Sequence, residues 1–315
     1  MAADPTGPYA AVNAVCYSGY REGQSPDLGL HPTYAETKED LLLLARHGWR
    51  LLRLYDCNES SETALEVIAR EGLPFQVMLG AWLGAEASNP GCPWGGTYPE
   101  EQLEKNRAAN SANIDRLIAL ARRFPAQLHS LSAGNEATVD WTDHLVPEES
   151  VIAYVRRLKA ALPHPVTFCE NYLPWLGKLD RLAAEVDFLS VHTYPAWEQK
   201  SVAEALAFTE ENVEAVARRH PDKPVVITEA GWATESNGRG IPRENASEAL
   251  QKEYYTQLLE WSRRRGVLTF VFEAFDEPWK GSPDPAEPEK HWGLFTVGRT
   301  PKLALQPEPG PGGAR

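Results

Sequence analysis

The stretch LHSLSAGNEATVD, residues 128–140, places a short apolar run directly before a glycine, an amide and a carboxylate. A run of this length that is apolar at most positions predicts a β-strand buried on both faces, as in a parallel sheet. Side chains at the point where such a strand ends often carry function. Asn135 and Glu136 are therefore candidate site residues, and a second acid is expected elsewhere if Glu136 does chemistry.

Seven other apolar runs resemble this one and are separated by longer segments with helical periodicity. In chain order the eight runs are 11–17, 50–55, 75–82, 128–133, 166–169, 186–191, 224–229 and 268–275. Strand and helix alternating eight times in about 300 residues predict an α/β fold with a single (β/α)8 TIM barrel. An open doubly wound sheet is the alternative, but the chain has no glycine-rich nucleotide-binding motif.

The barrel is expected to span 9–305, with flexible tails at 1–8 and 306–315. Segment 60–72 is expected to open with a serine cap and to end at Gly72. The link between the fifth and sixth strands is short and only weakly helical.

Composition narrows the class of partner. The net charge of −13 opposes binding to nucleic acid or to an anionic membrane, and no apolar segment is long enough to span a bilayer. The start, MAADPTGPYA, lacks the features of a signal peptide. Four cysteines show no zinc-ligand spacing, so they are expected to be small buried hydrophobes or to form one or two disulfides.

The partner acid comes from the end of the seventh run, where Glu229 closes VVITE. Because βα loops gather at one face of a barrel, Glu136 and Glu229 are expected to face the same mouth. Two carboxylates there suit glycoside hydrolysis, one as proton donor and one as nucleophile. Chance placement of acids is one alternative. A metal site built on His192 and Glu229 is another, although we expect no metal.

Four motifs in order resemble glycoside hydrolase family 17, a branch of the retaining (β/α)8 clan A. They are GNEATV, TEAGWAT, FEAFDEPWK and HWGLF, and CYSGY and LRLYDCN resemble the first two strands of that family. The resemblance covers roughly residues 12–305. The Ala-Gly-Trp-Ala around Glu229 is closer to bacterial members of the family than to plant ones, which carry Thr-Gly-Trp-Pro.

The resemblance implies roles for individual residues. It makes Glu136 the general acid/base and Glu229 the nucleophile. It implies that Asn135 binds the sugar 2-hydroxyl and that Tyr194 donates a hydrogen bond to the nucleophile. It also implies that Trp232 forms the floor under the sugar at the cleavage point.

Further residues are expected to bind substrate. The resemblance implies that Glu277 and Lys280 support the catalytic pair, with the Lys280 charge favouring an ionised nucleophile. Tyr17 and Tyr55 leave the barrel at its active end and are expected to line the site. Trp82 and Trp94 either stack on sugar rings or anchor their long loop. Glu170, Asn171, Tyr172 and Trp175 are candidates to line a sugar subsite, with packing under the loop as the alternative for Trp175. His192 is expected to be a hydrogen-bonding residue rather than a catalyst.

The resemblance implies a retaining hydrolase that cleaves internal β-1,3-glucosidic bonds of glucan without a cofactor. A β-1,3-glucanosyltransferase using the same two acids is the alternative, followed by a relative acting on β-1,4-linked glucan or mannan. The expected partner is a β-glucan chain, and the protein is expected to be a monomer. A polymer substrate favours a secreted or periplasmic location.

Overall fold

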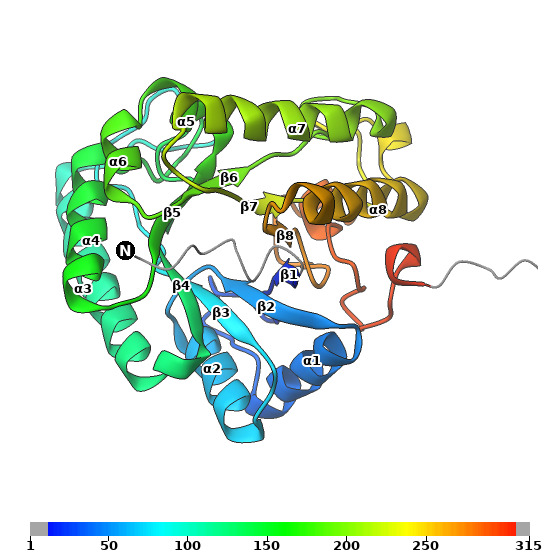
Figure 1. Cartoon of the computed structure of the whole chain (residues 1–315), viewed down its shortest axis with the longest axis horizontal. Coiled ribbons are helices and arrows are strands. Elements are labelled where there is room, and N and C mark those ends of the chain that lie inside the picture. The colour runs from blue at the N-terminus through cyan, green and yellow to red at the C-terminus, as the bar shows by residue number, and fades with distance from the viewer. Residues whose placement is uncertain (1–11, 307–315) are drawn as a thin grey trace, which may run out of the picture.

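The computed structural model describes residues 12–306, which form a closed barrel of eight parallel strands in chain order (Figure 1). The strand β8 pairs with β1 and closes the barrel, which confirms the predicted fold. The strands are β1 (Asn13–Cys16), β2 (Trp49–Leu54), β3 (Gln76–Gly80), β4 (Leu128–Asn135), β5 (Val166–Asn171), β6 (Leu189–His192), β7 (Val225–Ala230) and β8 (Thr269–Val271). The expected tails, 1–8 and 306–315, lie outside the described residues apart from Gln306.

Helices surround the barrel and cover its outer face (Figure 1). They are α1 (Tyr34–Arg46), α2 (Glu59–Glu71), α3 (Glu100–Arg123), α4 (Glu148–Ala161), α5 (Tyr172–Gly177), α6 (Asp180–Glu185), α7 (Val202–Arg219) and α8 (Glu248–Arg265). The weakly helical link between β5 and β6 holds two six-residue helices, α5 and α6, where most other links hold one longer helix. Among the described residues, no helix has the length and apolarity needed to cross a membrane.

The start of α2 differs from the expectation of a serine cap. Asn58 caps the helix instead, and its side chain accepts a hydrogen bond from the Ser61 amide at 3.2 Å. Asparagine satisfies a free helix amide at least as well as serine, so the earlier residue takes the position. The helix ends as expected at Gly72, whose φ of 61° lies in the left-handed region that glycine adopts without steric cost.

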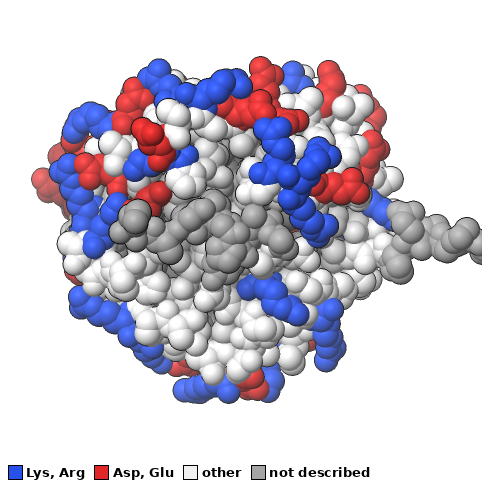
Figure 2. Space-filling model, in the orientation of Figure 1, with Lys and Arg blue, Asp and Glu red and all other residues white. Residues whose placement is uncertain are grey.

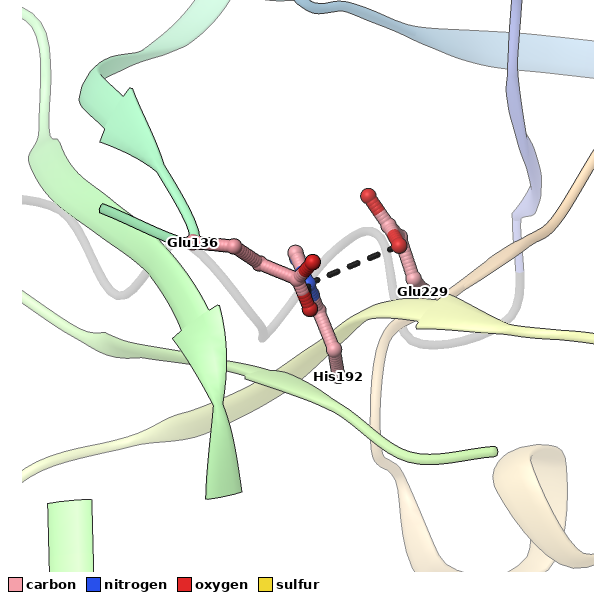
Figure 3. A group of neighbouring side chains, drawn as sticks. All are labelled: Glu136, His192 and Glu229. Atoms are coloured by element: carbon pink, nitrogen blue, oxygen red, sulfur yellow. Dashed lines mark hydrogen bonds and ion pairs between the residues drawn. The ribbon is translucent and has the colours of Figure 1, made fainter. Parts of the chain in front are cut away.

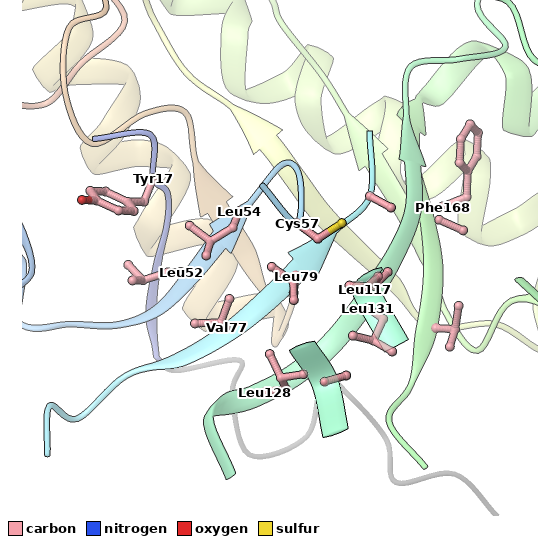
Figure 4. Close-up of a cluster of buried hydrophobic side chains, with 14 of the residues drawn as sticks. Tyr17, Leu52, Leu54, Cys57, Val77, Leu79, Leu117, Leu128, Leu131 and Phe168 are labelled. Atoms are coloured by element: carbon pink, nitrogen blue, oxygen red, sulfur yellow. The ribbon is translucent and has the colours of Figure 1, made fainter. Parts of the chain in front are cut away.

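Alternation along the strands separates two apolar layers. In β2, Leu52 and Leu54 pack in the cluster drawn in Figure 4, whereas Leu51 belongs to a second cluster that joins strand residues to side chains of α7 and α8. Fully burying each such side chain contributes about 2 kcal/mol to stability. Arg53 follows Leu52 and is only 2% exposed, so the strand delivers a charged side chain into the barrel interior.

The remaining expectations about composition concern cysteines and charge. All four cysteines are buried and unpaired, as expected for small hydrophobes, so the alternative of disulfides is wrong for this structure. On the face shown in Figure 2, acidic and basic side chains are interspersed around the periphery.

Candidate active site

The β4 exit is a tight turn that projects Glu136 from the barrel. Gly134 has a φ of 115°, and a Cβ there would lie 2.8 Å from a methyl carbon of Leu83 and 3.0 Å from the Phe168 ring. Glu136 itself has a φ of 43°, a strained value for a residue other than glycine. Its amide donates to the Cys169 carbonyl at 2.9 Å, which ties the strained residue to β5.

Glu136 and Glu229 meet across the barrel mouth, and His192 contacts both of them (Figure 3). A carboxylate oxygen of each acid and a ring nitrogen of His192 all lie within 4.8 Å of one another. The Glu136 side chain is 29% exposed and the Glu229 side chain 6%. The two acids therefore share one site but differ in their access to water.

Glu229 lies among groups that favour its ionised form. Arg53 donates to one of its oxygens at 2.5 Å, the Tyr194 hydroxyl donates to the other, and His192 Nδ1 is 3.5 Å away. Burial alone would raise the pKa of Glu229. The charges of His192 and Arg53, with the hydrogen bonds from Tyr194 and Arg53, outweigh burial and lower it to about 2. Glu229 is therefore a carboxylate at neutral pH.

Arg53 joins the nucleophile candidate to the amide beside Glu136. Its second terminal nitrogen donates to the Asn135 side-chain oxygen, while the first also donates to the Thr228 carbonyl at 3.1 Å. Arg53 was not among the site residues predicted from the sequence. An arginine inside an otherwise apolar buried run was the available signal, because such a charge needs an anionic partner.

His192 Nδ1 lies 2.9 Å from a Glu136 oxygen, closer than its 3.5 Å to Glu229. Burial lowers the pKa of His192, but Glu229, the Cys169 thiol and Glu136 outweigh it and raise the pKa to about 10. A metal ion held by these three groups would have to compete with the Arg53 guanidinium, which already neutralises Glu229.

Residues in the segment after β8 form a second charged group in the cleft. Lys280 contacts Glu273 at 2.9 Å and also pairs with Glu277. Burial and repulsion from Glu277 raise the pKa of Glu273. The expectation that the Lys280 charge keeps the nucleophile ionised needs correction, because Lys280 is engaged by these two acids whereas Arg53 and His192 contact Glu229 directly.

An open cleft of about 1370 Å³ surrounds the two acids. Of the residues expected to bind substrate, all but one line it: Tyr17, Tyr55, Asn135, Tyr194, Glu277 and Lys280. Trp82, Trp94, Asn171 and Tyr172 line it as well.

Trp232 is the exception and is not among the lining residues. It is 1% exposed, its indole nitrogen donates to the Asn245 carbonyl at 2.8 Å, and its ring lies 5.5 Å from that of Tyr254. The expectation that Trp232 forms the sugar floor is therefore corrected: its ring packs toward α8. Trp292 lines the cleft, 5.2 Å from the Tyr194 ring.

Two buried residues at and after the end of β5, Glu170 and Trp175, make hydrogen bonds to neighbouring segments and do not line the cleft. Glu170 is fully buried and accepts hydrogen bonds from the Thr138 amide at 2.9 Å and hydroxyl at 2.6 Å, which holds the turn after Glu136. Burial and the charge of Glu136 raise the pKa of Glu170 to about 7. Trp175 is also fully buried and donates to the Ser190 carbonyl at 2.9 Å, so it packs rather than lines a subsite.

Comparison with known proteins gives relatives that match nearly the whole chain. A glucan 1,3-β-glucosidase from Arthroderma benhamiae is 26% identical over 96% of this chain and 93% of its own length. The crystal structure of an endo-laminarinase from Formosa Hel1_33_131 aligns at 27% identity with a TM-score of 0.83, covering 97% of this chain and 88% of that one. A family 17 β-1,3-glucanosyltransferase from Rhizomucor miehei, at 19% identity and a TM-score of 0.73 over 95% of this chain and 98% of its own, shares the fold.

The family model described as the BtgE/BtgC glycoside hydrolase domain matches residues 14–293, a range that contains both Glu136 and Glu229. The resemblance to family 17 is confirmed, and the chain belongs to the family of BtgE/BtgC glycoside hydrolase domains.

Proposed function

We propose that this chain is a retaining glycoside hydrolase that cleaves internal β-1,3-glucosidic bonds of glucan, with Glu136 as acid/base and Glu229 as nucleophile. The observation that carries the proposal is the close approach of two carboxylates in unlike surroundings. Carboxylate oxygens of the two acids lie within 4.8 Å, and only Glu229 is enclosed by a guanidinium and a phenol.

The separation favours retention of anomeric configuration. Retaining enzymes hold their carboxyl groups about 5–5.5 Å apart, whereas inverting enzymes need about 6.5–9.5 Å to fit a water molecule. One oxygen of Glu136 and one of Glu229 lie within 4.8 Å of each other, which supports the shorter of these two spacings. Direct attack by Glu229 is therefore favoured over attack by water.

The reaction then proceeds in two displacements. A Glu229 oxygen bonds to the anomeric carbon while the glycosidic C–O bond breaks, and the leaving oxygen takes a proton from Glu136. In the second step Glu136, now ionised, takes a proton from water. The water oxygen bonds to the anomeric carbon and the ester bond to Glu229 breaks. Arg53, which Asn135 holds through a hydrogen bond, orients the nucleophile.

The form of the cleft supports an extended, uncharged polymer as substrate. Acidic side chains along it include Asp56 and Glu198, which disfavour an anionic chain. Tyr and Trp rings along the same cleft suit the apolar faces of sugar rings. The β-1,3 linkage and the internal cleavage are supported by the relatives, which include the endo-laminarinase.

The test is a product time course on laminarin and laminarihexaose in ¹⁸O-water, followed by mass spectrometry. Short oligosaccharides of mixed length that carry one ¹⁸O at the new reducing end are expected. Proton NMR of the first products is expected to show the β-anomer, as retention requires.

Other results would redirect the assignment. Unlabelled products longer than laminarihexaose would identify a β-1,3-glucanosyltransferase working through the same two acids. Early α-anomer would contradict the two-step mechanism. Turnover of β-1,4-glucan or mannan, with laminarin left intact, would overturn the linkage.

A further inference from the structure

His192 is the last residue of β6, is completely buried and contacts both of the acids proposed to be catalytic. Its Nδ1 is 2.9 Å from Glu136 and 3.5 Å from Glu229, so a single N–H points at both carboxylates (Figure 3). Neither step of the proposed mechanism uses this group. The question is what a buried imidazole shared between an acid/base and a nucleophile does for a reaction in which only one of them stays charged.

We propose that His192 is a positioning residue that transfers its electrostatic support from Glu229 to Glu136 between the two half-reactions. This inference rests on the proposed function. Before glycosylation the imidazolium is shared by both acids. Once Glu229 becomes an ester, the imidazolium faces one carboxylate, Glu136, and keeps it ionised to act as a base.

The surroundings of Glu229 explain why this transfer is possible. Arg53 and the Tyr194 hydroxyl also contact Glu229, so the nucleophile does not depend on His192 alone. Among the described residues Glu136 has no arginine or lysine ion-pair partner, and His192 is the one histidine within ion-pair distance of it. A second histidine, His144, interacts with Glu136 by charge alone, without an ion-pair contact. Removing the imidazolium therefore affects the base of the second step more than the nucleophile of the first.

Neighbouring titratable groups set the charge of His192. Glu136 faces it from the end of β4, Glu229 from β7 and the Cys169 thiol from β5. Arg53, from β2, and Glu170, from β5, act on the same group through Glu229 and Glu136. The two acids and the thiol favour the protonated ring, and the pKa of about 10 keeps His192 an imidazolium across the neutral range.

The sign of the pH effect follows from the state of the intermediate. After glycosylation Glu229 is an ester and does not titrate, so deglycosylation requires only that the general base be ionised. The imidazolium Nδ1 lies 2.9 Å from that base and stabilises its negative charge. With a neutral side chain at position 192 this stabilisation is lost, so deglycosylation is expected to fail at a higher pH as the solution is acidified.

The experiment uses 2,4-dinitrophenyl β-laminaribioside, whose leaving group departs without a proton from Glu136. With this substrate kcat reports deglycosylation and kcat/KM reports glycosylation. In His192→Asn and His192→Gln, the acid limb of kcat is expected to move up by at least about one pH unit, roughly tenfold in proton concentration. The acid limb of kcat/KM is expected to move less.

Two further readouts separate this role from simple packing. Intact-mass spectrometry at acid pH is expected to show more glycosyl-enzyme in the variants than in the wild type. Azide attacks the anomeric carbon and displaces Glu229 without needing a base, so it is expected to restore dinitrophenol release in the variants. His47→Asn, an exposed substitution at the end of α1, is the matched control and is expected to change neither limb.

Each outcome decides the matter. Equal losses in kcat and kcat/KM with unshifted limbs would overturn the inference, as would wild-type profiles in both variants. If the wild type forms glycosyl-enzyme but the acid limbs of the variants do not shift, the role of His192 is overturned and the proposed function stands. A wild-type enzyme that neither releases dinitrophenol nor forms an adduct overturns the proposed function with it.

Discussion

The exits of β4 and β7 each present a glutamate to the same cleft, yet they are built in opposite ways. Glu229 lies within β7, is 6% exposed at its side chain, and is contacted by Arg53, Tyr194 and His192. Glu136 lies one residue beyond β4 in a left-handed turn, and its side chain is 29% exposed.

The difference matches two chemical tasks. A nucleophile must stay ionised and fixed in position, which buried hydrogen-bond donors around the carboxylate achieve. An acid/base must lose and regain a proton in each cycle, which requires contact with substrate oxygen and with water. Glu136 on its turn has that access, whereas Glu229 in its strand has the fixed donors.

Removing the buried acid is expected to have the largest effect. Glu229→Ala removes the oxygen proposed to attack, so laminarin hydrolysis is expected to fall by about 10⁵-fold or more, a loss typical of a covalent nucleophile. The rate is measured by reducing-sugar release, and circular dichroism checks that the fold is retained. Glu22→Ala, at an exposed position, is the control. Near-normal hydrolysis by Glu229→Ala would refute the assignment.

Removing the exposed acid is expected to have an effect that depends on the leaving group. Glu136→Gln is expected to slow laminarin cleavage by about 10²–10⁴-fold, the usual contribution of general acid catalysis. Glycosylation by a dinitrophenyl laminaribioside, which needs no proton, is expected to be much less affected. Comparison of kcat/KM for the two substrates measures this. Equal losses on both would remove Glu136 from the acid role.

Weakening the support of Glu229 is expected to act through pH. In Arg53→Lys the bidentate link between Glu229 and Asn135 is lost, so the pKa of Glu229 rises from its depressed value near 2. Since Glu229 must be ionised to attack, activity is lost at a higher pH on acidification. A fall of about tenfold to a hundredfold in kcat/KM at neutral pH is expected, corresponding to one charge-assisted bond.

The pH profile of kcat/KM distinguishes this effect from general damage. Arg50→Lys, at an exposed position on the same strand, is the control and is expected to leave the profile unchanged. A uniform loss in Arg53→Lys with no shift of the acid limb would mean that Arg53 positions substrate or strand rather than charge.

The same contrast shows how far sequence reasoning reached. Eight apolar runs predicted the barrel because strands buried on both faces have few polar positions. The end of a run predicted where Glu136 and Glu229 emerge, since topology alone brings strand ends together. Arg53 was not predicted as a site residue, because an apolar run that predicts a buried strand does not show which residue will pair with a charge inside it. In the structure that residue is Glu229.

Trp232 was misplaced for a related reason. Its motif gives its position in the chain but not the direction of its ring, and that direction depends on packing contributed by Tyr254 in a distant helix. Cap choice at α2 failed more simply, because Asn58 and Ser60 both have capping side chains and the earlier one is used.

The two tryptophans after β3, Trp82 and Trp94, offer the prediction with the smallest expected effect on activity. Trp82 is 39% exposed and its ring lies 4.7 Å from that of His144, whose Nε2 is 3.0 Å from the Asn135 carbonyl. Trp94 is 66% exposed and has no ring neighbour among the described residues. A platform held in place loses less entropy when a sugar stacks on it, so Trp82 is expected to contribute more to binding.

Trp82→Ala is therefore expected to lower kcat/KM for laminarihexaose by about three- to tenfold, on the order of 1 kcal/mol of stacking. Trp94→Ala is expected to cost less than about threefold by the same reasoning. For both variants the loss in kcat/KM is compared with the loss on a laminaribiose derivative, whose shorter chain need not reach these tryptophans. Equal losses on long and short substrates would mean that Trp82 shapes the Glu136 turn through His144 rather than binding a sugar, since only a stacking role depends on chain length.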